Sequence, residues 1–238
     1  MTSLVMLSGG LDSTVTSCIA KDRLDPGGEL HAISFQYGQR HAVRELEQAS
    51  SISEYLGMKS HQFVRIPFNE NFFDGATSLV VGEKGEFDVP TPPKAGTEPG
   101  IPSSWVPQRN MLFLTYAFGY ADTIGADVVY TGFNAVDYSG YPDCRPEYYD
   151  KMRESLCYGS KLWTQYKVPM NIETPIIHLS KAQIVKMAID LNVPLHHTWS
   201  CYQGNDVPCG LCDSCILRAK GFLEAGFQDP LLARPDTG

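Results

Sequence analysis

The stretch VMLSGGLDSTVTSCIAK, residues 5–21, decides the fold of this chain. An apolar run stops at Gly9 and Gly10, and apolar residues then recur at the spacing of a helix, at Leu11, Val15, Cys18 and Ile19. This pattern is typical of a buried strand that enters a tight turn and continues directly into a helix.

Strand-like and helix-like segments alternate further along the chain. The next three are expected to be a strand, a helix and a strand at 29–38, 42–57 and 60–68. A well-buried apolar helix is expected at 110–125, followed by a strand at 126–132 and a helix at 145–161. A last strand and helix are expected at 171–179 and 180–194. Ser180 and Gln183 have capping-box spacing. The alternation predicts an α/β fold, an open parallel sheet flanked by helices.

Composition limits the classes of protein to be considered. The chain has 238 residues, a formal net charge of −8 and seven cysteines. The acidic net charge argues against a broad surface for binding nucleic acid. The sequence contains no apolar run of about 18 residues, so no membrane span is expected. The N-terminus lacks the pattern of a signal peptide, so a cytoplasmic protein is expected. We expect an α/β domain over 1–195, with a long loop at about 69–107, and a cysteine-rich segment and tail over 196–238.

The glycine loop has the composition of a phosphate-binding turn without the lysine of a Walker loop. Its main-chain N–H groups would stand at a helix N-terminus, where anions are stabilised. Asp12 could help to hold Mg²⁺ against the phosphates. The alternative is a plain turn in which Asp12 or Ser13 caps the helix. The residues expected to contact ATP are Ser8, Gly9, Gly10, Leu11, Asp12, Ser13 and Thr14.

Four cysteines near the C-terminus form the second informative group. They are Cys201, Cys209, Cys212 and Cys215, with the last three at CxxCxxC spacing. Four thiolates suit a tetrahedral structural Zn²⁺ ion, one per chain, which we favour. An iron–sulfur cluster is the alternative, and four unliganded buried thiols are the least favoured interpretation.

Further polar residues follow strand ends or begin helices, which is where open α/β sheets bind ligands. Each alone has a structural explanation, such as a solvated lysine or a surface ion pair. Together they are candidates to neutralise phosphate or carboxylate charge and to bind substrate. They are Arg40, Arg109, Asp137, Tyr138, Asp143, Arg145 and Lys181.

The loop SGGLDST resembles the SGGxDS pattern of PP-loop ATP pyrophosphatases, which have an adenine nucleotide alpha hydrolase-like, Rossmann-like fold. The resemblance implies that the loop holds the β,γ-pyrophosphate while a substrate attacks the α-phosphorus. The segments YGQRH, VPQRN, SGYPDCR and CGLCDSCILRAKGF match, in order, the 7-cyano-7-deazaguanine (preQ0) synthase family over about residues 4–222. One departure is Gln108, where the family usually has glycine.

Membership of this family would imply an ATP-dependent carbon–nitrogen ligase of queuosine biosynthesis. It would convert 7-carboxy-7-deazaguanine and ammonia into the 7-cyano compound through an adenylated acid and an adenylated amide. Asp12, Arg109 and Lys181 would be catalytic, with Arg40, Asp137, Tyr138, Asp143 and Arg145 on the substrate. The cofactors would be Zn²⁺ and Mg²⁺ with ATP, and the chain would form a homodimer without nucleic-acid or membrane partners.

The sequence disfavours three other functions. A PP-loop tRNA-thiolating enzyme would need a basic face for RNA, which the composition disfavours. A glutamine-dependent amide ligase would need a glutaminase domain, for which 238 residues leave no room. An inactive nucleotide-binding or zinc-scaffold protein would not need the intact SGGLDS loop.

Overall fold

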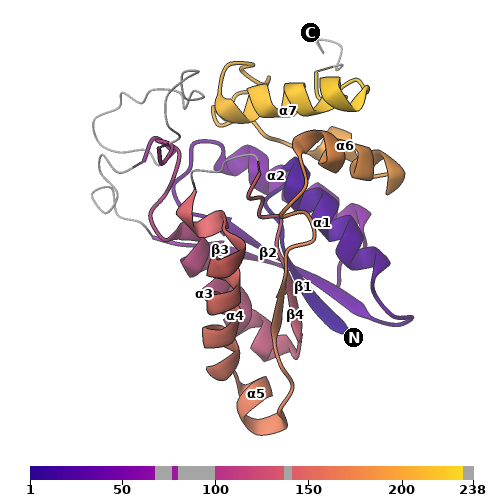
Figure 1. Cartoon of the computed structure of the whole chain (residues 1–238). Helices are drawn as coiled ribbons and strands as arrows, with labels where there is room; N and C mark the ends of the chain where they lie inside the picture. Colours follow the sequence, from indigo (N-terminus) through magenta and orange to yellow (C-terminus); the bar gives the residue numbers. More distant parts are fainter. Residues whose placement is uncertain (68–76, 80–99, 137–140, 233–238) are drawn as a thin grey trace.

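The computed structural model describes residues 1–67, 77–79, 100–136 and 141–232 (Figure 1). Its centre is a five-stranded parallel sheet with the strand order β3-β2-β1-β4-β5. The strands are β1 Thr2–Met6, β2 Glu29–Gln36, β3 Ser60–Arg65, β4 Val128–Tyr130 and β5 Asn171–Glu173. The predicted open parallel sheet is therefore confirmed.

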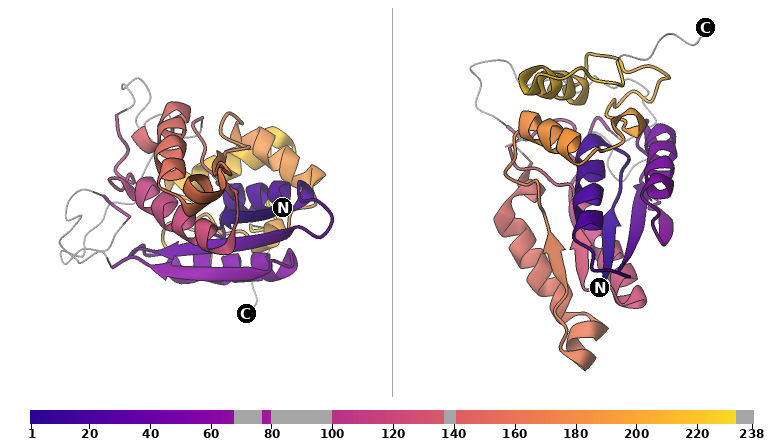
Figure 2. Two further views of the ribbon diagram at one scale, coloured as in Figure 1. Left: turned by 90° about the horizontal axis from the view of Figure 1, so that it is seen from below. Right: turned by 90° about the vertical axis from the view of Figure 1, so that its right-hand side faces the viewer.

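Helices cover both faces of the sheet (Figure 2). They are α1 Leu11–Asp22, α2 Ala42–Tyr55, α3 Arg109–Ile124, α4 Pro146–Tyr158, α5 Lys161–Tyr166, α6 Lys181–Asp190 and α7 Asp213–Ala225, with short 3-10 turns η1 Pro142–Cys144 and η2 Leu195–His197. Successive side chains of a strand point to opposite faces. Leu4 and Met6 of β1 accordingly pack with α3 and α4, whereas Val5 packs with α1 and α2.

The predicted strand at 171–179 is shorter than expected. β5 ends at Glu173, and residues 175–178 form turns. Pro175 has no N–H to donate to a neighbouring strand, which accounts for the early end. The expected helix at 145–161 also divides: α4 ends at Tyr158, and Ser160 starts α5 by accepting a hydrogen bond from the Trp163 main-chain N–H at 3.1 Å.

α3 is less buried than its composition suggested. Leu114, Ala117 and Phe118 face the core, but Met111 and Tyr116 are 44% and 45% exposed in the described structure. The prediction of a well-buried helix is therefore wrong for one of its faces. Apolar content alone does not show on how many sides a helix is covered.

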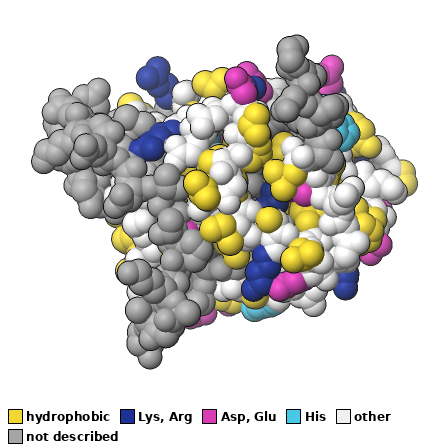
Figure 3. Space-filling view, turned by 90° about the horizontal axis from the view of Figure 1, so that it is seen from above, with side chains coloured by type: hydrophobic (Ala, Val, Ile, Leu, Met, Phe, Trp, Pro, Cys, Tyr) yellow, Lys and Arg dark blue, Asp and Glu magenta, His cyan; other side chains and the backbone are white. Residues whose placement is uncertain are grey.

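The C-terminal segment packs tightly against the α/β domain. Phe222 of α7 belongs to one buried cluster with residues of α1 and α6. The outer side of this segment exposes apolar residues, and Figure 3 shows hydrophobic side chains gathered on the face that carries α7; among those exposed are Val207, Leu211, Ile216 and Leu223. The boundary at residue 195 stays a prediction. None of the helices in the described ranges combines the length and apolar character that crossing a membrane requires.

Gln108 occupies a backbone conformation that favours glycine, with a φ of 56° at the N-cap of α3. A left-handed conformation costs a residue with a Cβ about 1 kcal/mol. We expect Gln108→Gly to raise the free energy of unfolding by about 1 kcal/mol, measured by chemical denaturation. Asn192 has a similar φ of 52°, but asparagine tolerates this region, so Asn192→Gly is a control that should change little. A loss of stability in Gln108→Gly would contradict this account.

Candidate functional site

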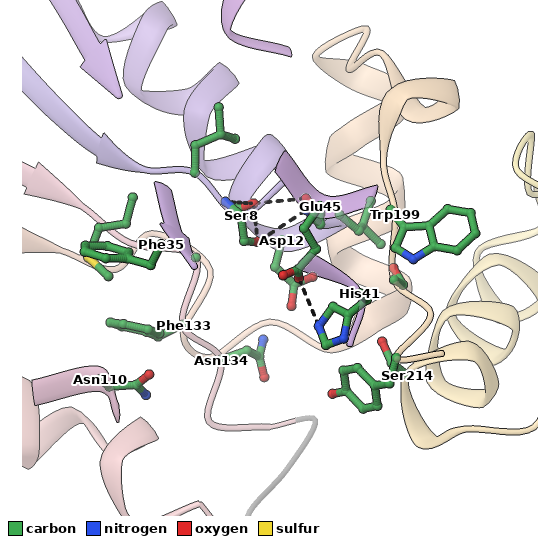
Figure 4. Close-up of a pocket in the computed structure, with 18 of the residues that line it drawn as sticks. Ser8, Asp12, Phe35, His41, Glu45, Asn110, Phe133, Asn134, Trp199 and Ser214 are labelled. Carbon is green, nitrogen blue, oxygen red and sulfur yellow. Dashed lines mark hydrogen bonds and ion pairs between the residues drawn. The ribbon is translucent and has the colours of Figure 1, made fainter. Parts of the chain in front are cut away.

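The described residues enclose a cavity of about 290 Å³ at the carboxyl ends of β1, β2 and β4. Residues that follow these strands form its floor. The start of α3 supplies one wall, and the N-terminal ends of α6 and α7 supply another. Figure 4 shows Ser8 of the glycine loop, Asp12 of α1, and His41 and Glu45 at the start of α2 pointing into the same space. Parallel α/β sheets bind ligands at this edge, so this cavity is the candidate active site.

Most of the glycine loop lines the floor of the cavity, and close backbone contacts fix its path. Gly9 and Thr14 are not among the described lining residues, and the ATP contacts of the loop stay a prediction. Gly9 has a φ of +80°, and a Cβ there would lie 2.4 Å from the main-chain oxygen of Glu45. A Cβ on Gly132, after β4, would lie 2.7 Å from the main-chain nitrogen of Ser13. Both positions therefore need glycine, because α2 and the end of β4 press directly against the loop.

The N-terminus of α1 opens into the cavity. Gly10 is its N-cap and has no side chain with which to cap it, so the interpretation of Asp12 or Ser13 as the cap is wrong. The Ser8 hydroxyl accepts a hydrogen bond from the Gly10 main-chain N–H at 3.3 Å. The hydroxyl groups of Ser8 and Ser13 lie 2.9 Å apart and form a hydrogen bond. Helix dipole and hydroxyl groups together favour an anion such as a phosphate at this place.

Asp12 and Lys181 meet across the cavity although 169 positions separate them in sequence. The Lys181 ammonium donates hydrogen bonds to both carboxylate oxygens of Asp12, at 2.7 and 2.8 Å. The Lys181 side chain is 14% exposed and the Asp12 side chain is 26% exposed, so both groups are shielded but reachable from the cavity. The predicted Mg²⁺ role of Asp12 stays a prediction, since its carboxylate is occupied by Lys181 in this structure.

A glycine of α7 sets the path of the Lys181 side chain. A Cβ on Gly221 would lie 2.3 Å from Cγ of Lys181. We expect Gly221→Ala to displace this lysine. Because Lys181 is predicted to be catalytic and misplaced catalytic groups lose much of their effect, activity should fall at least tenfold. Gly119 in α3 has no atom within 4 Å of its Cβ position. Gly119→Ala is the matched control and should retain activity with slightly higher stability. Unchanged steady-state activity in Gly221→Ala would refute the positioning role.

Arg109 lies at the start of α3 with its guanidinium in the cavity wall. It donates a hydrogen bond to the Tyr37 hydroxyl at 3.2 Å and lies 5.6 and 5.8 Å from the ring centres of Tyr37 and Phe113. Burial by itself lowers the pKa of Arg109. The nearby Tyr37, Tyr141 and Asp143 together raise this pKa by more than burial lowers it, so the net shift is upward. The site therefore holds a permanent positive charge suited to phosphate or carboxylate.

Asp143 holds the start of α3, which forms this wall, through hydrogen bonds. One carboxylate oxygen accepts a hydrogen bond from the Trp105 indole at 3.2 Å, and the other accepts one from the Asn110 main-chain N–H at 3.4 Å. The cavity lining, as far as it is described, includes neither Asp143, Arg40 nor Arg145. Asp137 and Tyr138 lie outside the described residues. The substrate-binding role of these five residues stays a prediction.

Several lining residues were not anticipated from the sequence. Aromatic rings give the cavity flat apolar walls: Phe35 and Phe113 stack with ring centres 4.3 Å apart. His41 and Glu45 form a buried pair, with Nε2 and Oε1 3.4 Å apart. The spacing of this pair at the start of a helix was visible in the sequence, but nothing there showed that it faces the loop.

The four cysteines form a compact cluster beside the cavity. Their sulfur atoms all lie within 4.8 Å of one another, and Cys201 and Cys212 are fully buried. Main-chain N–H groups of Gln203 and Cys209 donate to the Cys201 sulfur at 3.4 and 3.3 Å, which suits a thiolate. The donor set therefore fits a metal ion that prefers four sulfur ligands.

This cluster also builds part of the cavity. Cys212 is the N-cap of α7, and Ser214, Leu217 and Arg218 from the next turns line the cavity. Arg218 is held by Asp229 through hydrogen bonds of 2.7 and 2.9 Å. A metal bound by the cysteines would therefore fix the start of the helix that closes the site.

Comparison with known proteins identifies the family of this chain. Residues 2–226 match the family described as queuosine biosynthesis protein QueC. The chain is 44% identical to the 7-cyano-7-deazaguanine synthase of Acetivibrio thermocellus, and the match covers 96% of each chain. It is 44% identical to that of Thermoplasma volcanium over 96% of this chain and 89% of the relative, and 43% identical to that of Oceanobacillus iheyensis over 96% of each. The chain therefore belongs to the QueC family.

Proposed function

We propose that this chain is an ATP-dependent carbon–nitrogen ligase that converts 7-carboxy-7-deazaguanine and ammonia into 7-cyano-7-deazaguanine, within queuosine biosynthesis. The observation that carries this proposal is the likeness to the named synthases over nearly the whole length of both chains. The cavity supports it, because a loop suited to phosphates and an aromatic-walled space lie side by side.

The chemistry requires two activations at the same centre. The substrate carboxylate attacks the α-phosphorus of ATP, pyrophosphate leaves, and ammonia then displaces AMP to give an amide. The amide oxygen attacks a second ATP, and loss of AMP from that adduct leaves the nitrile. Each substrate oxygen departs on an AMP molecule, so one activation site used twice accounts for the whole conversion.

Different residues of the cavity would bind the phosphates, neutralise charge and contact the base. The loop Ser8–Thr14 would hold the pyrophosphate, with Asp12 supporting Mg²⁺ as ATP binds. Lys181 and Arg109 would neutralise charge on the phosphates and the carboxylate, since preorganised cations stabilise a transition state in which charge moves. Phe35 and Phe113 would provide apolar surface for a planar base.

We assign the four-cysteine cluster a structural Zn²⁺ ion. When bound, the ion would hold together the chain segments that carry the four thiolates. An iron–sulfur cluster remains the alternative, and metal analysis with an absorption spectrum of the purified protein separates the two. A colourless protein with one zinc per chain supports our assignment.

We also propose that the chain works as a cytoplasmic homodimer on small molecules and without nucleic acid. A net charge of −8 supports a function without nucleic acid, because RNA binding needs a basic surface. A tRNA-thiolating function is disfavoured for the same reason.

The decisive experiment measures pyrophosphate release from ATP, with and without 7-carboxy-7-deazaguanine, and identifies the product by mass. We expect release that depends on this acid, and a nitrile when ammonia is present. Asp12→Ala should abolish the release, because the loop loses its carboxylate and Lys181 loses its partner. Full activity in that variant would refute the assignment of the loop, whereas release with other acids alone would refute the substrate.

A further inference from the structure

The proposed reaction makes a demand that the phosphate-binding residues do not meet. Ammonia enters with three N–H bonds, and the nitrile product keeps none. One proton leaves when the nitrogen attacks the acyl adenylate and AMP departs, and a second leaves as the amide becomes its adenylated imidate. The third leaves as the C–O bond breaks and the C≡N bond forms. A proton acceptor must therefore work beside the reacting carbon three times in each turnover.

Most groups in the cavity wall are unsuited to this task at neutral pH. Asp12 is bound by Lys181, and Arg109 is cationic. Burial raises the pKa of the remaining weak acids of the described wall, so these groups keep their protons and have no basic lone pair of use. They are Tyr37, Tyr141, Cys144 and Tyr202.

His41 and Glu45 are the exception, and both line the cavity. His41 is the N-cap of α2, and Glu45 lies one helical turn later, so His41 Nε2 and Glu45 Oε1 lie 3.4 Å apart. The imidazole is 3% exposed and the carboxylate 19% exposed. Figure 4 shows the pair facing Ser8 and Asp12, on the side of the cavity where phosphate chemistry is proposed.

The surroundings hold this pair in one arrangement. The other carboxylate oxygen of Glu45 accepts a hydrogen bond from the Gln39 side chain at 3.1 Å. Gln39 in turn accepts a hydrogen bond from the Tyr37 main-chain N–H at 2.8 Å, which anchors it to the end of β2. The His41 ring packs against Tyr202 with ring centres 5.4 Å apart. Because Nε2 of His41 faces Glu45, the ring nitrogen left to accept a proton is Nδ1, which is buried and has no hydrogen-bond partner among the described residues. A carboxylate that fixes one ring nitrogen while the other stays unpartnered is the usual arrangement for a general base.

The charges around His41 keep its proton affinity useful. Burial lowers the pKa of the imidazole, while the Glu45 carboxylate and the main chain of Tyr202 raise it and the Arg109 charge lowers it. The net shift is upward from 6.5. The ring is therefore neutral, and able to accept a proton, only above that raised value.

We propose that His41, oriented by Glu45, is the general base that removes the protons of ammonia during amide and nitrile formation. This inference rests on the proposed function. In the first round the nitrogen lone pair forms the C–N bond, its proton passes to the imidazole, and AMP leaves with the electrons of the broken C–O bond. In the second round the same ring takes the two remaining protons and returns each to solvent.

The test uses the difference between adenylation and nitrogen transfer. Attack of the carboxylate on ATP releases no proton, so exchange of labelled pyrophosphate into ATP, measured with the acid but without ammonia, should not depend on His41. His41→Gln should keep this exchange within about threefold of wild type and reduce nitrile formation at least 100-fold. His61→Gln is the control: its ring contacts Ser34 at 2.7 Å outside the cavity, and both rates should be retained.

The pH dependence gives a second, independent result. At a fixed concentration of free ammonia, nitrile formation by the wild type should rise with pH through a value above 6.5, because the base must be neutral. Glu45→Gln removes the charge that raises this pKa, so the rise should move to lower pH while exchange persists. This variant serves if His41→Gln does not fold.

Three outcomes would overturn the assignment. They are wild-type nitrile formation in His41→Gln, an equal loss of exchange and nitrile formation, and a pH profile that Glu45→Gln leaves unmoved. Absence of acid-dependent exchange in the wild type would instead refute the proposed function itself, so the two failures are distinguishable.

Discussion

Lys181→Met should reduce pyrophosphate exchange that depends on 7-carboxy-7-deazaguanine by about 1,000-fold. Methionine keeps an unbranched stem beside Gly221, but removes the ammonium that binds both oxygens of Asp12. The cavity would lose a cation and gain an unpaired carboxylate, both of which oppose binding of the triphosphate in the transition state. Initial-rate measurements over a range of ATP concentrations give the effect on kcat and KM.

Lys186 provides a matched control on the same helix. It is exposed on α6 and does not line the described cavity, so Lys186→Met should retain normal exchange. A double variant of Asp12→Asn with Lys181→Met should lose less than the sum of the two single effects, because the residues act as a pair. An exchange rate within tenfold of wild type for Lys181→Met would contradict the assigned role.

Loss of the metal should have the second large effect. Cys212→Ser replaces a fully buried sulfur at the N-cap of α7. We expect the bound metal to be lost, the thermal midpoint to fall by about 10 °C, and exchange activity to drop at least 100-fold. The reason is that α7 carries Leu217 and Arg218 in the cavity wall and Gly221 against Lys181.

Cys157→Ser controls for the loss of a thiol as such. Cys157 lies on α4, away from the cluster, so this variant should keep its metal and its activity. Metal content is measured by atomic emission, the midpoint by circular dichroism, and activity by exchange. Full activity in metal-free Cys212→Ser would contradict the structural role of the metal.

Local signals made most of the fold predictable. The alternation of apolar runs and helical spacing gave the strand and helix segments, and the capping box at Ser180 marked the start of α6 correctly. The errors have local causes too. Pro175 ended β5 early, and Gly159 with Ser160 divided the helix after η1. The exposed face of α3 depends on what packs against it, which no local pattern records.

The candidate site was predictable only in part. The loop and the four cysteines are each compact in sequence, so their spacing could be interpreted directly. The pairing of Asp12 with Lys181, and the position of His41 and Glu45 beside the loop, depend on contacts between distant segments. Asp143 accepts hydrogen bonds from Trp105 and Asn110, which the sequence did not indicate, and its substrate-binding role stays a prediction. Such contacts arise from the tertiary fold.

The cavity joins residues from both ends of the chain, and this has a consequence for its biosynthesis. The Trp199 main-chain N–H donates to the carbonyl of Gly9 at 2.8 Å, and α7 closes the wall opposite the loop. On the ribosome, β1 is paired on both sides only after β4 has emerged, and the wall beside the glycine loop is complete only after α7 has emerged. A nascent or truncated chain that lacks α7 would therefore have a sheet without a closed site. The cavity can therefore close only after α7 has been synthesised.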